Sequence, residues 1–344
     1  MKKIIYSICL LSLAVGCAKT EVQYDQPEQI SFAPVAGTVT KAAVGSGSAP
    51  GCNLIVSANA GTAGQNASTY DELYFDEVEF TGTSEYTATG VFWPNVKHLS
   101  FAGITKSEGI TTGNIEIDVK GNSITVTNYQ QQEVGTENND LMWFGQTAPA
   151  GKQSEAIEVS MQHACSWLVF NFKGDVTTGA ANTTWKITNV TVNSLSKKET
   201  ATLTNGATWT ESDESDNLRS LTVYNYTKTD EETTNNAKNV GHQLANTAFV
   251  PSTDGIIVIP QTPTSISVTY NYVSQGSIVI EETATVYLDY DGVSGNAKWE
   301  AGKKYTYDIT IGATAIKIAP TAGEWEPYGK NNEKPEGTPI TGTI

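Results

Sequence analysis

Hydrophobic and polar residues alternate with a period of two along most of the chain, which is typical of β-strands that bury one face. The run TSISVTYNY (264–272) alternates without interruption, and the pattern recurs in ATVYLDY (284–290) and YTYDITIG (305–312). Helical periodicity is nearly absent, and only Asn236–Ala248 is predicted to hold a short helix. The pattern therefore predicts an all-β protein.

Short turns separate the predicted strands. In NIEIDVKGNSITVTN (114–128) the chain turns at Gly121 between two alternating segments, which is a hairpin signal. Half-buried strands joined in this way favour antiparallel β-sandwiches. The 344 residues leave room for two domains in tandem. A seam rich in glycine, proline and polar residues (Thr147–Glu155) predicts one domain over 29–150 and a second over 151–319.

The N-terminal segment has the features of an export signal. An apolar run, Ile4–Gly16, follows two lysines and is too short to cross a bilayer as a helix. Cys17 follows small residues, which fits a lipobox, where the first mature cysteine carries a diacylglyceryl group. Leucine is commoner than Ala14 at its position, and a plain signal peptide is the alternative. We predict a lipoprotein signal over 1–16, lipidation of Cys17 and a polar tether over 17–28.

Charge limits the partners of the chain. The net charge is −16, and nucleic acid is excluded as a partner because its phosphates need many Lys and Arg contacts. Arg219 is the only arginine, which excludes anion clamps built from several arginines. Of four cysteines, Cys52 and Cys165 lie beyond the export signal. They can pair in an oxidising compartment, although two separate buried thiols are the preferred interpretation.

The sequence offers little catalytic chemistry. Its three histidines lack metal-ligand spacing to one another or to cysteine. His163 and Cys165 fall on one face of a strand, so a thiolate–imidazole pair is an alternative to ordinary packing. DYDGVSGN (289–296) begins like a calcium loop but lacks the later ligands, so it predicts a hairpin turn. Nucleophile elbows, phosphate loops and dinucleotide fingerprints are missing. We therefore predict neither an enzyme nor a cofactor or metal site.

Tryptophans define an alternative of another class, a surface lipoprotein that binds glycans. Three tryptophans lie in apolar segments, where core packing is expected. The other four have polar neighbours: Trp185, Trp209, Trp299 and Trp325. A groove lined by exposed Trp185, Trp209 or Trp325 would suit a glycan. The many acidic residues leave a glycosidase-like carboxylate pair open, although none has an apolar setting that would raise its pKa.

Seven blocks occur in an order that resembles the fimbrillin family, the Mfa-like major and accessory subunits of type V pili in Gram-negative anaerobes. Three features of the order are the most specific: His163, the pair Pro260-Gln261, and the spacing Trp299…Gly302…Tyr305. The blocks are QISFAP (29–34), TKAAV (40–44), GVFWPNVKHLSFAGI (90–104), NNDLMWFGQT (138–147), MQHACSWLVFNFKGD (161–175), IIVIPQTPTSISVTYNY (256–272) and WEAGKKYTYDITIG (299–312).

The resemblance implies two transthyretin-like β-sandwich domains and a structural role in a fimbria. It also implies export as a lipoprotein to the outer membrane and the cell surface. In the family a protease then cuts after a basic residue and removes the lipid with the first strand. The matching bond here lies between Lys41 and Ala42. Arginine is the usual residue at that site, so the lysine leaves the identity of the protease open.

Removal of the first strand has a direct physical consequence. Its removal would withdraw Ile30, Phe32 and Val35 from a sandwich. It would leave an open edge that recruits a strand from another chain. The C-terminal tail, 320–344, is the predicted donor through Ile340 and Ile344. The alternatives are donation by ATAIKIAP (313–320) and a tail that takes no part. Head-to-tail donation does not close on itself and therefore builds a filament.

The expected partners follow from this interpretation. They are other fimbrial subunits, outer-membrane lipid through Cys17, and a host or bacterial surface ligand. A polymerising stalk subunit is the preferred role, and an accessory tip or anchor subunit is the alternative.

Overall fold

The computed structural model describes residues 27–34, 53–83, 85–106, 110, 114–130, 140–175, 183–210, 217–229, 240–245, 247–251, 255–274, 278–288, 298–312, 316–324 and 342–343. Within these ranges nearly all regular structure is β-strand, and the one helical element is a 3₁₀ turn, Ala67–Thr69 (η1). The all-β prediction is confirmed. The predicted helix over Asn236–Ala248 is wrong for its described residues, because His242–Gln243 (β16) pairs as a strand.

The first lobe is built on an eight-stranded sheet whose two ends are close in the sequence. Its order is β10-β8-β5-β2-β3-β4-β1-β9. The sheet folds over on itself at β3, which pairs with β2 along most of its length and with β4 only at Thr81 and Gly82. The strands are β1 (Gln29–Pro34), β2 (Leu54–Gly61), β3 (Glu72–Gly82), β4 (Tyr86–Phe92), β5 (His98–Thr105), β8 (Met142–Phe144), β9 (Ile157–Val159) and β10 (Gln162–His163).

A four-stranded sheet forms a third layer over this lobe. Its order is β14-β13-β7-β6, and it packs against Ile55, Ile104 and Trp143 on the outer face of β2, β5 and β8. Those three strands are therefore buried along nearly their whole length instead of on alternate residues, because both of their faces are covered. The strands of this layer are β6 (Ile115–Asp118), β7 (Ser123–Gln130), β13 (Lys198–Leu203) and β14 (Ala207–Thr210).

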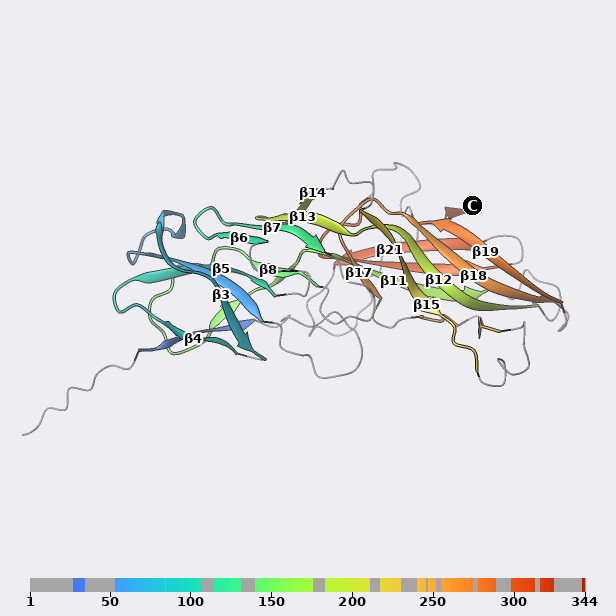
Figure 1. Ribbon diagram of the computed structural model, residues 1–344, viewed down its shortest axis with the longest axis horizontal. Helices are drawn as coiled ribbons and strands as arrows, with labels where there is room; N and C mark the ends of the chain where they lie inside the picture. The colour runs from blue at the N-terminus through green and yellow to red at the C-terminus, as the bar shows by residue number, and fades with distance from the viewer. Residues whose placement is uncertain are drawn as a thin grey trace, which may run out of the picture.

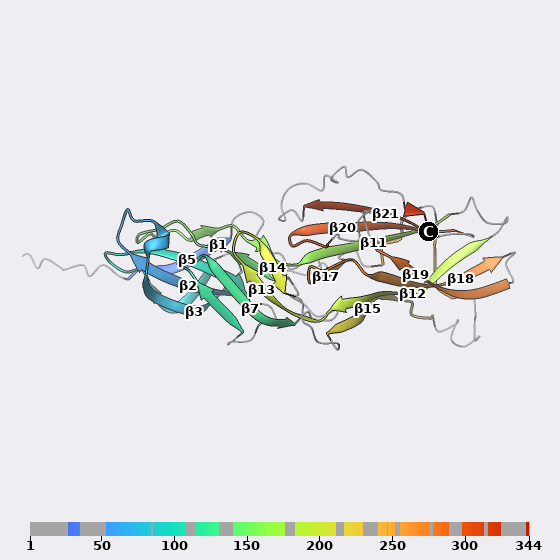
Figure 2. The same ribbon diagram turned by 90° about the horizontal axis from the view of Figure 1, so that it is seen from above.

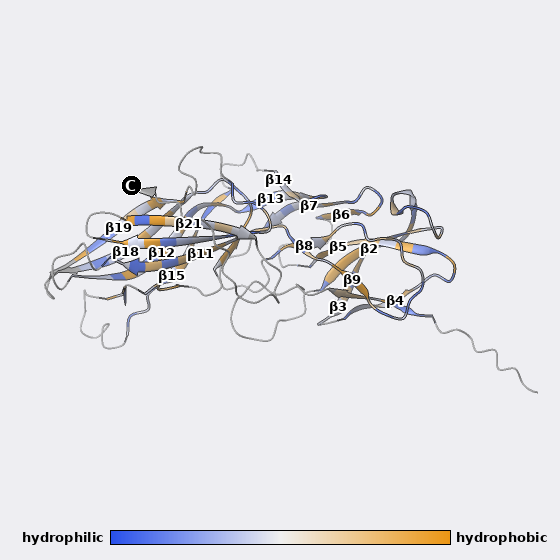
Figure 3. Ribbon diagram, turned by 180° about the vertical axis from the view of Figure 1, so that it is seen from behind, coloured by the Kyte–Doolittle hydropathy of each residue, from blue (hydrophilic) through white to orange (hydrophobic). Residues whose placement is uncertain are grey.

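The second lobe is a two-layer sandwich. One sheet has the order β17-β11-β20-β21-β22, and the other has the order β15-β12-β18-β19 with β16 added to β12. Apolar and polar residues alternate along β12, β18 and β19 (Figure 3), as expected for strands with one buried face. The strands are β11 (Ser166–Gly174), β12 (Thr184–Ser196), β15 (Leu218–Asn225), β17 (Ile256–Val258), β18 (Ser265–Ser274), β19 (Ile278–Tyr287), β20 (Lys303–Ile311), β21 (Ile316–Glu324) and β22 (Gly342–Thr343).

The lobes lie end to end in an elongated molecule, and strands cross between them (Figure 1, Figure 2). β12 belongs to the second lobe, and after Lys197 the chain continues as β13 in the third layer of the first lobe. β9, β10 and β13 lie in the predicted range 151–319 but pair with strands of 29–150, and β14 joins the first lobe through β13. The predicted division at residue 150 therefore does not coincide with a division between sheets.

Candidate assembly site

β1 fills a slot in the first lobe with a strand on either side. It runs antiparallel to β4, with Phe32 opposite Tyr86, and parallel to β9, with Phe32 opposite Ile157. A bulge interrupts the β4 register between Gln29 and Ser31. At the entry to the slot the backbone N–H of Trp93 donates to the Glu28 carbonyl at 2.8 Å. β1 thus joins the two neighbouring strands.

The predicted anchor residues Ile30 and Phe32 lie in the core. Both side chains are 0% exposed. The Phe32 ring lies 4.9 Å from the ring of Phe80 and 5.2 Å from that of Phe101, both edge to face. Burying a side chain of this size contributes about 1.5–3 kcal/mol. Val35, the third predicted anchor, lies outside the described residues.

β9 is attached to the described sheet through β1 alone. It stands at the end of the strand order, so β1 is its one strand neighbour among the described elements. β4 keeps a second neighbour, β3, through only two residue pairs, Thr81↔Thr87 and Gly82↔Tyr86. Without β1, the edges of β4 and β9 that now pair with it would expose unpaired backbone N–H and C=O groups. These two edges would border an apolar groove.

The C-terminus lies in the other lobe, on the edge strand β21. β22 pairs with β21 through Lys317↔Thr343 and Ile318↔Gly342. Figure 2 shows this end of the chain on the second lobe and β1 in the first. The alternative donor segment 313–320 is built into the sandwich from Ile316 onward, because these residues pair with β20 along the whole of β21.

The remaining predicted site residues fall outside the described ranges, and their predictions stay untested. They are the lipidation site Cys17, the processing residues Lys41 and Ala42, and the tail residues Ile340 and Ile344.

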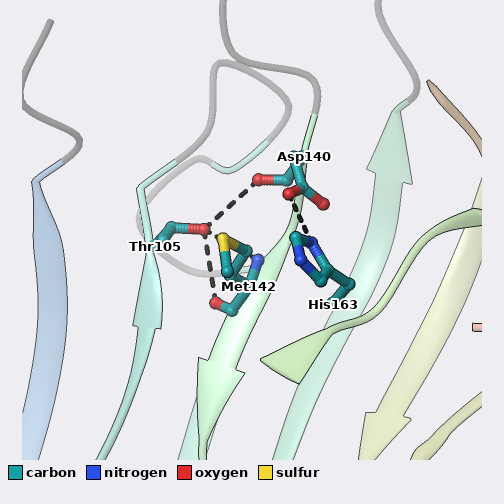
Figure 4. A network of polar contacts seen from close by, with 4 residues as sticks. All are labelled: Thr105, Asp140, Met142 and His163. Atoms are coloured by element: carbon teal, nitrogen blue, oxygen red, sulfur yellow. Dashed lines mark hydrogen bonds and ion pairs between the residues drawn. The ribbon is translucent and has the colours of Figure 1, made fainter. Parts of the chain in front are cut away.

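His163 pairs with a carboxylate, which the sequence pattern did not single out. Its Nδ1 lies 2.7 Å from Oδ2 of Asp140, and both side chains are more than nine-tenths buried (Figure 4). The backbone N–H of Met142 donates to the Thr105 hydroxyl at 2.9 Å beside this pair. Burial, and secondly the charge of Asp140, raise the pKa of the Cys165 thiol. Cys165 is therefore a packed thiol, and the thiolate–imidazole alternative loses its support.

Gln261 and Trp299, two of the most specific residues of the resemblance, have structural contacts. The Gln261 amide accepts from the backbone N–H of Ser196 at 2.6 Å and donates to the Ser194 carbonyl at 3.1 Å, where β12 passes toward β13. Trp299 donates its indole N–H to the Tyr307 hydroxyl at 2.7 Å. These side chains satisfy buried backbone and hydroxyl groups, as buried polar groups require.

The tryptophan groove expected of a glycan-binding protein is not formed by Trp185 or Trp209. Trp185 is 1% exposed in the core of the second lobe. Trp209 is half-buried and donates its indole N–H to the Ala164 carbonyl. Trp299 is buried, and Trp325 lies outside the described residues.

The described residues hold no group of three or more His, Cys, Asp or Glu side chains placed to bind a metal ion. Over the same ranges, no helix is long and apolar enough to span a membrane.

The fimbrillin-like family model matches residues 40–325, and the chain belongs to this family. The membership supports a fimbrial subunit and implies a cell-surface appendage.

Solved structures agree in fold. A fimbrial protein from Bacteroides vulgatus superposes with a TM-score of 0.55 at 17% identity, covering 79% of this chain and 92% of its own. A candidate cell adhesion protein from Bacteroides uniformis superposes with a TM-score of 0.51 at 16% identity, covering 88% of this chain and 99% of its own. At these identities the likeness concerns the fold alone. No curated protein sequence matches the chain.

Proposed function

We propose that the chain is a structural subunit of a surface fimbria, exported as a lipoprotein through Cys17 and assembled by strand donation after β1 is removed. The observation that carries the proposal is the slot of β1. β1 holds β9 in the sheet and buries Ile30 and Phe32, yet it precedes all other described strands in the chain.

A cut between Lys41 and Ala42 would separate β1 covalently from β2, because the bond lies between the two strands in the sequence. β1 would then be held by non-covalent contacts alone. Once it leaves, the groove lined by Phe80, Phe101 and Phe144 accepts an apolar strand from another chain. Main-chain hydrogen bonds to β4 and β9 supply the affinity, and the pockets of Ile30 and Phe32 set the register.

The C-terminal tail is the donor in this proposal. The predicted tail began at residue 320, but residues 320–324 belong to β21 and pair with β20. The other described residues of the tail, Gly342 and Thr343, pair with only two residues of β21, so little is lost when they leave that edge. Donor and acceptor belong to opposite lobes of an elongated chain (Figure 1), which suits a head-to-tail, heterologous contact that continues as a filament. The family match, 40–325, includes neither β1 nor β22, the two strands that this mechanism exchanges.

The precursor is anchored in the outer membrane by lipid on Cys17, and the processed subunit resides in the fimbria. The chain acts as a structural subunit and not as an enzyme. We prefer a stalk role to a tip or anchor role because a tail follows the last sandwich strand. Each subunit of a stalk needs such a segment to donate to the next subunit.

A reversible lock on β1 tests the proposal. Ser31 and Thr87 are Cα partners on β1 and β4, so Ser31→Cys with Thr87→Cys would bridge the strands. We expect the oxidised variant to be cut yet to stay monomeric, and to form filaments after reduction. The matched control is a cysteine pair at Thr269 and Thr283, which face each other on β18 and β19.

The control pair should polymerise in both redox states. Filaments formed at the normal rate by the oxidised Ser31–Thr87 variant would contradict strand exchange at this slot.

A further inference from the structure

One face of the second lobe carries a regular lattice of uncharged polar side chains. Two rows cross all four strands β15, β12, β18 and β19, and each position is set by the strand register. Neighbouring strands lie about 4.8 Å apart, and the rows lie about 7 Å apart along β12, β18 and β19, where they are separated by two residues. Along β15 they are three residues apart because a bulge interrupts its register with β12. The first row is Thr222, Thr191, Ser267 and Thr285, and the second is Asn225, Asn189, Thr269 and Thr283.

Hydrogen bonds between side chains hold this lattice in place. The Thr269 and Thr283 hydroxyls lie 2.9 Å apart, and those of Thr191 and Thr222 lie 3.3 Å apart. Asn193 donates from its amide nitrogen to Ser267 at 2.9 Å. A hydroxyl has one donor and two acceptor sites, so these residues keep hydrogen-bonding capacity toward solvent. The groups are therefore preorganised, which lowers the entropy lost on binding.

An exposed aromatic side chain stands at one end of the lattice. Tyr287 is 76% exposed, and on β19 it lies two residues beyond Thr285, on the same face. Its Cα partner on β18 is Ser265, which accepts a hydrogen bond from Asn193 at 3.1 Å. A tyrosine gives a rigid, amphipathic contact surface at low entropic cost. Here it stands next to a fixed amide and two hydroxyls.

The lattice is uncharged, although the chain has a net charge of −16. At the end of the lattice opposite Tyr287, Asn271 is buried and donates to the Val240 carbonyl at 2.7 Å. The uncharged rows therefore end before this residue. The first charged side chains of the face, Lys186 and Glu281, are the cross-strand partners of that residue. The uncovered part thus matches a ligand that is itself neutral and that presents many hydroxyl groups.

We propose that this face, defined by its two rows with Asn193, Ser265 and Tyr287, binds a neutral saccharide. One sugar ring stacks on Tyr287, and the hydroxyls of the following rings exchange hydrogen bonds with the rows. A neutral glycan satisfies three features together: the missing charge, the paired donor and acceptor groups, and the single aromatic platform. Charged glycans would approach an acidic chain with no basic residue on the lattice to receive them.

The test measures binding of the purified full-length chain to arrayed oligomers of glucose, mannose, galactose and N-acetylhexosamine, together with sialylated and sulfated counterparts. The strongest neutral oligomer is then titrated by calorimetry. We expect Tyr287→Ala to weaken binding about tenfold or more, and Ser267→Glu to weaken it similarly by placing a charge in the lattice. Tyr74→Ala, at an exposed tyrosine of the other lobe, is the matched control and should bind normally.

Three results would overturn the proposal: no binding to any neutral oligomer, preference for anionic glycans, or binding that Tyr287→Ala and Ser267→Glu leave unchanged. Self-association of the chain that Tyr287→Ala abolishes, in the absence of glycan binding, would likewise assign the face to a second copy and overturn it. Circular dichroism checks that each variant is folded. Filament formation is scored separately, and the face variants should polymerise normally, so failure of this proposal is distinguishable from failure of strand exchange.

Discussion

β1 and β22 are both short strands near the ends of the chain, but they are held differently. β1 lies between two strands and buries Ile30 and Phe32, whereas β22 pairs on one side only, with two residues of β21. The N-terminal strand is thus part of a core, and the C-terminal strand is an addition to an edge. In strand exchange the slow, controlled step is therefore expected to be the departure of β1, because the release of β22 breaks only two residue pairs.

The largest expected effect is the difference between β1 and β22 in how much each stabilises the precursor. Phe32→Ala leaves a cavity among Phe80, Phe101 and Phe144 and should lower the free energy of unfolding of the precursor by about 3–5 kcal/mol. Deletion of residues 342–344 should change it by less than about 0.5 kcal/mol, as for other surface changes. Urea unfolding followed by tryptophan fluorescence measures both. Equal losses from the two variants would contradict the comparison.

The buried pair of Asp140 and His163, beside β8 and β10, gives a smaller effect. Asp140→Ala removes the carboxylate that lies 2.7 Å from His163 and should lower the free energy of unfolding by about 1–3 kcal/mol. Glu116→Gln, at an exposed residue of β6, is the control and should be neutral within about 0.5 kcal/mol. An Asp140→Ala variant as stable as this control would show that the pair does not stabilise the lobe.

Cys165 reports on the opening of the region between the lobes. Because burial and then Asp140 raise its pKa, the thiol stays protonated at neutral pH and should react with a disulfide reagent only when the structure opens. The test uses a variant in which Cys9, Cys17 and Cys52 are serine, so that one thiol is counted. The reaction rate should rise with urea in parallel with unfolding. Rapid reaction of the native protein would show that this core is open.

The smallest expected effect concerns the second lobe at alkaline pH. Burial, and secondly the hydrogen bond and charge of Glu282, raise the pKa of Tyr270 from 10.0 to about 12. Its contribution to stability is present below pH 10 and is lost as the pH rises from 10 to about 12, because the unfolded chain releases this proton first. Tyr270→Phe should therefore show a shallower loss of stability over that window. An unchanged slope would contradict the assigned shift.

Local pattern predicted the elements whose burial is one-sided. The alternation in TSISVTYNY corresponds to β18 (Ser265–Ser274), and the turn predicted at Gly121 joins β6 and β7. The anchor residues Ile30 and Phe32 lie in the first block of the family resemblance, and their spacing of two places both on one face of a strand. These features depend on neighbouring residues, so a single sequence contains them.

The features that the sequence did not predict depend on long-range contacts. β7 pairs with β13, about seventy residues away, and no local signal specifies that register. The same pairing covers the second face of β2, β5 and β8 and brings β13 and β14 across the predicted domain division. The partner of His163 and the lattice around Tyr287 also arise only when distant strands align, so neither could be read from spacing.

N-terminal sequencing and intact mass of the subunit from surface-sheared filaments test the central claim most directly. The account predicts a chain that begins at Ala42 in high-mass polymers and lacks Ile30 and Phe32. A polymerised subunit that still begins at acylated Cys17 and retains β1 would contradict the removal of this strand as the step that permits assembly.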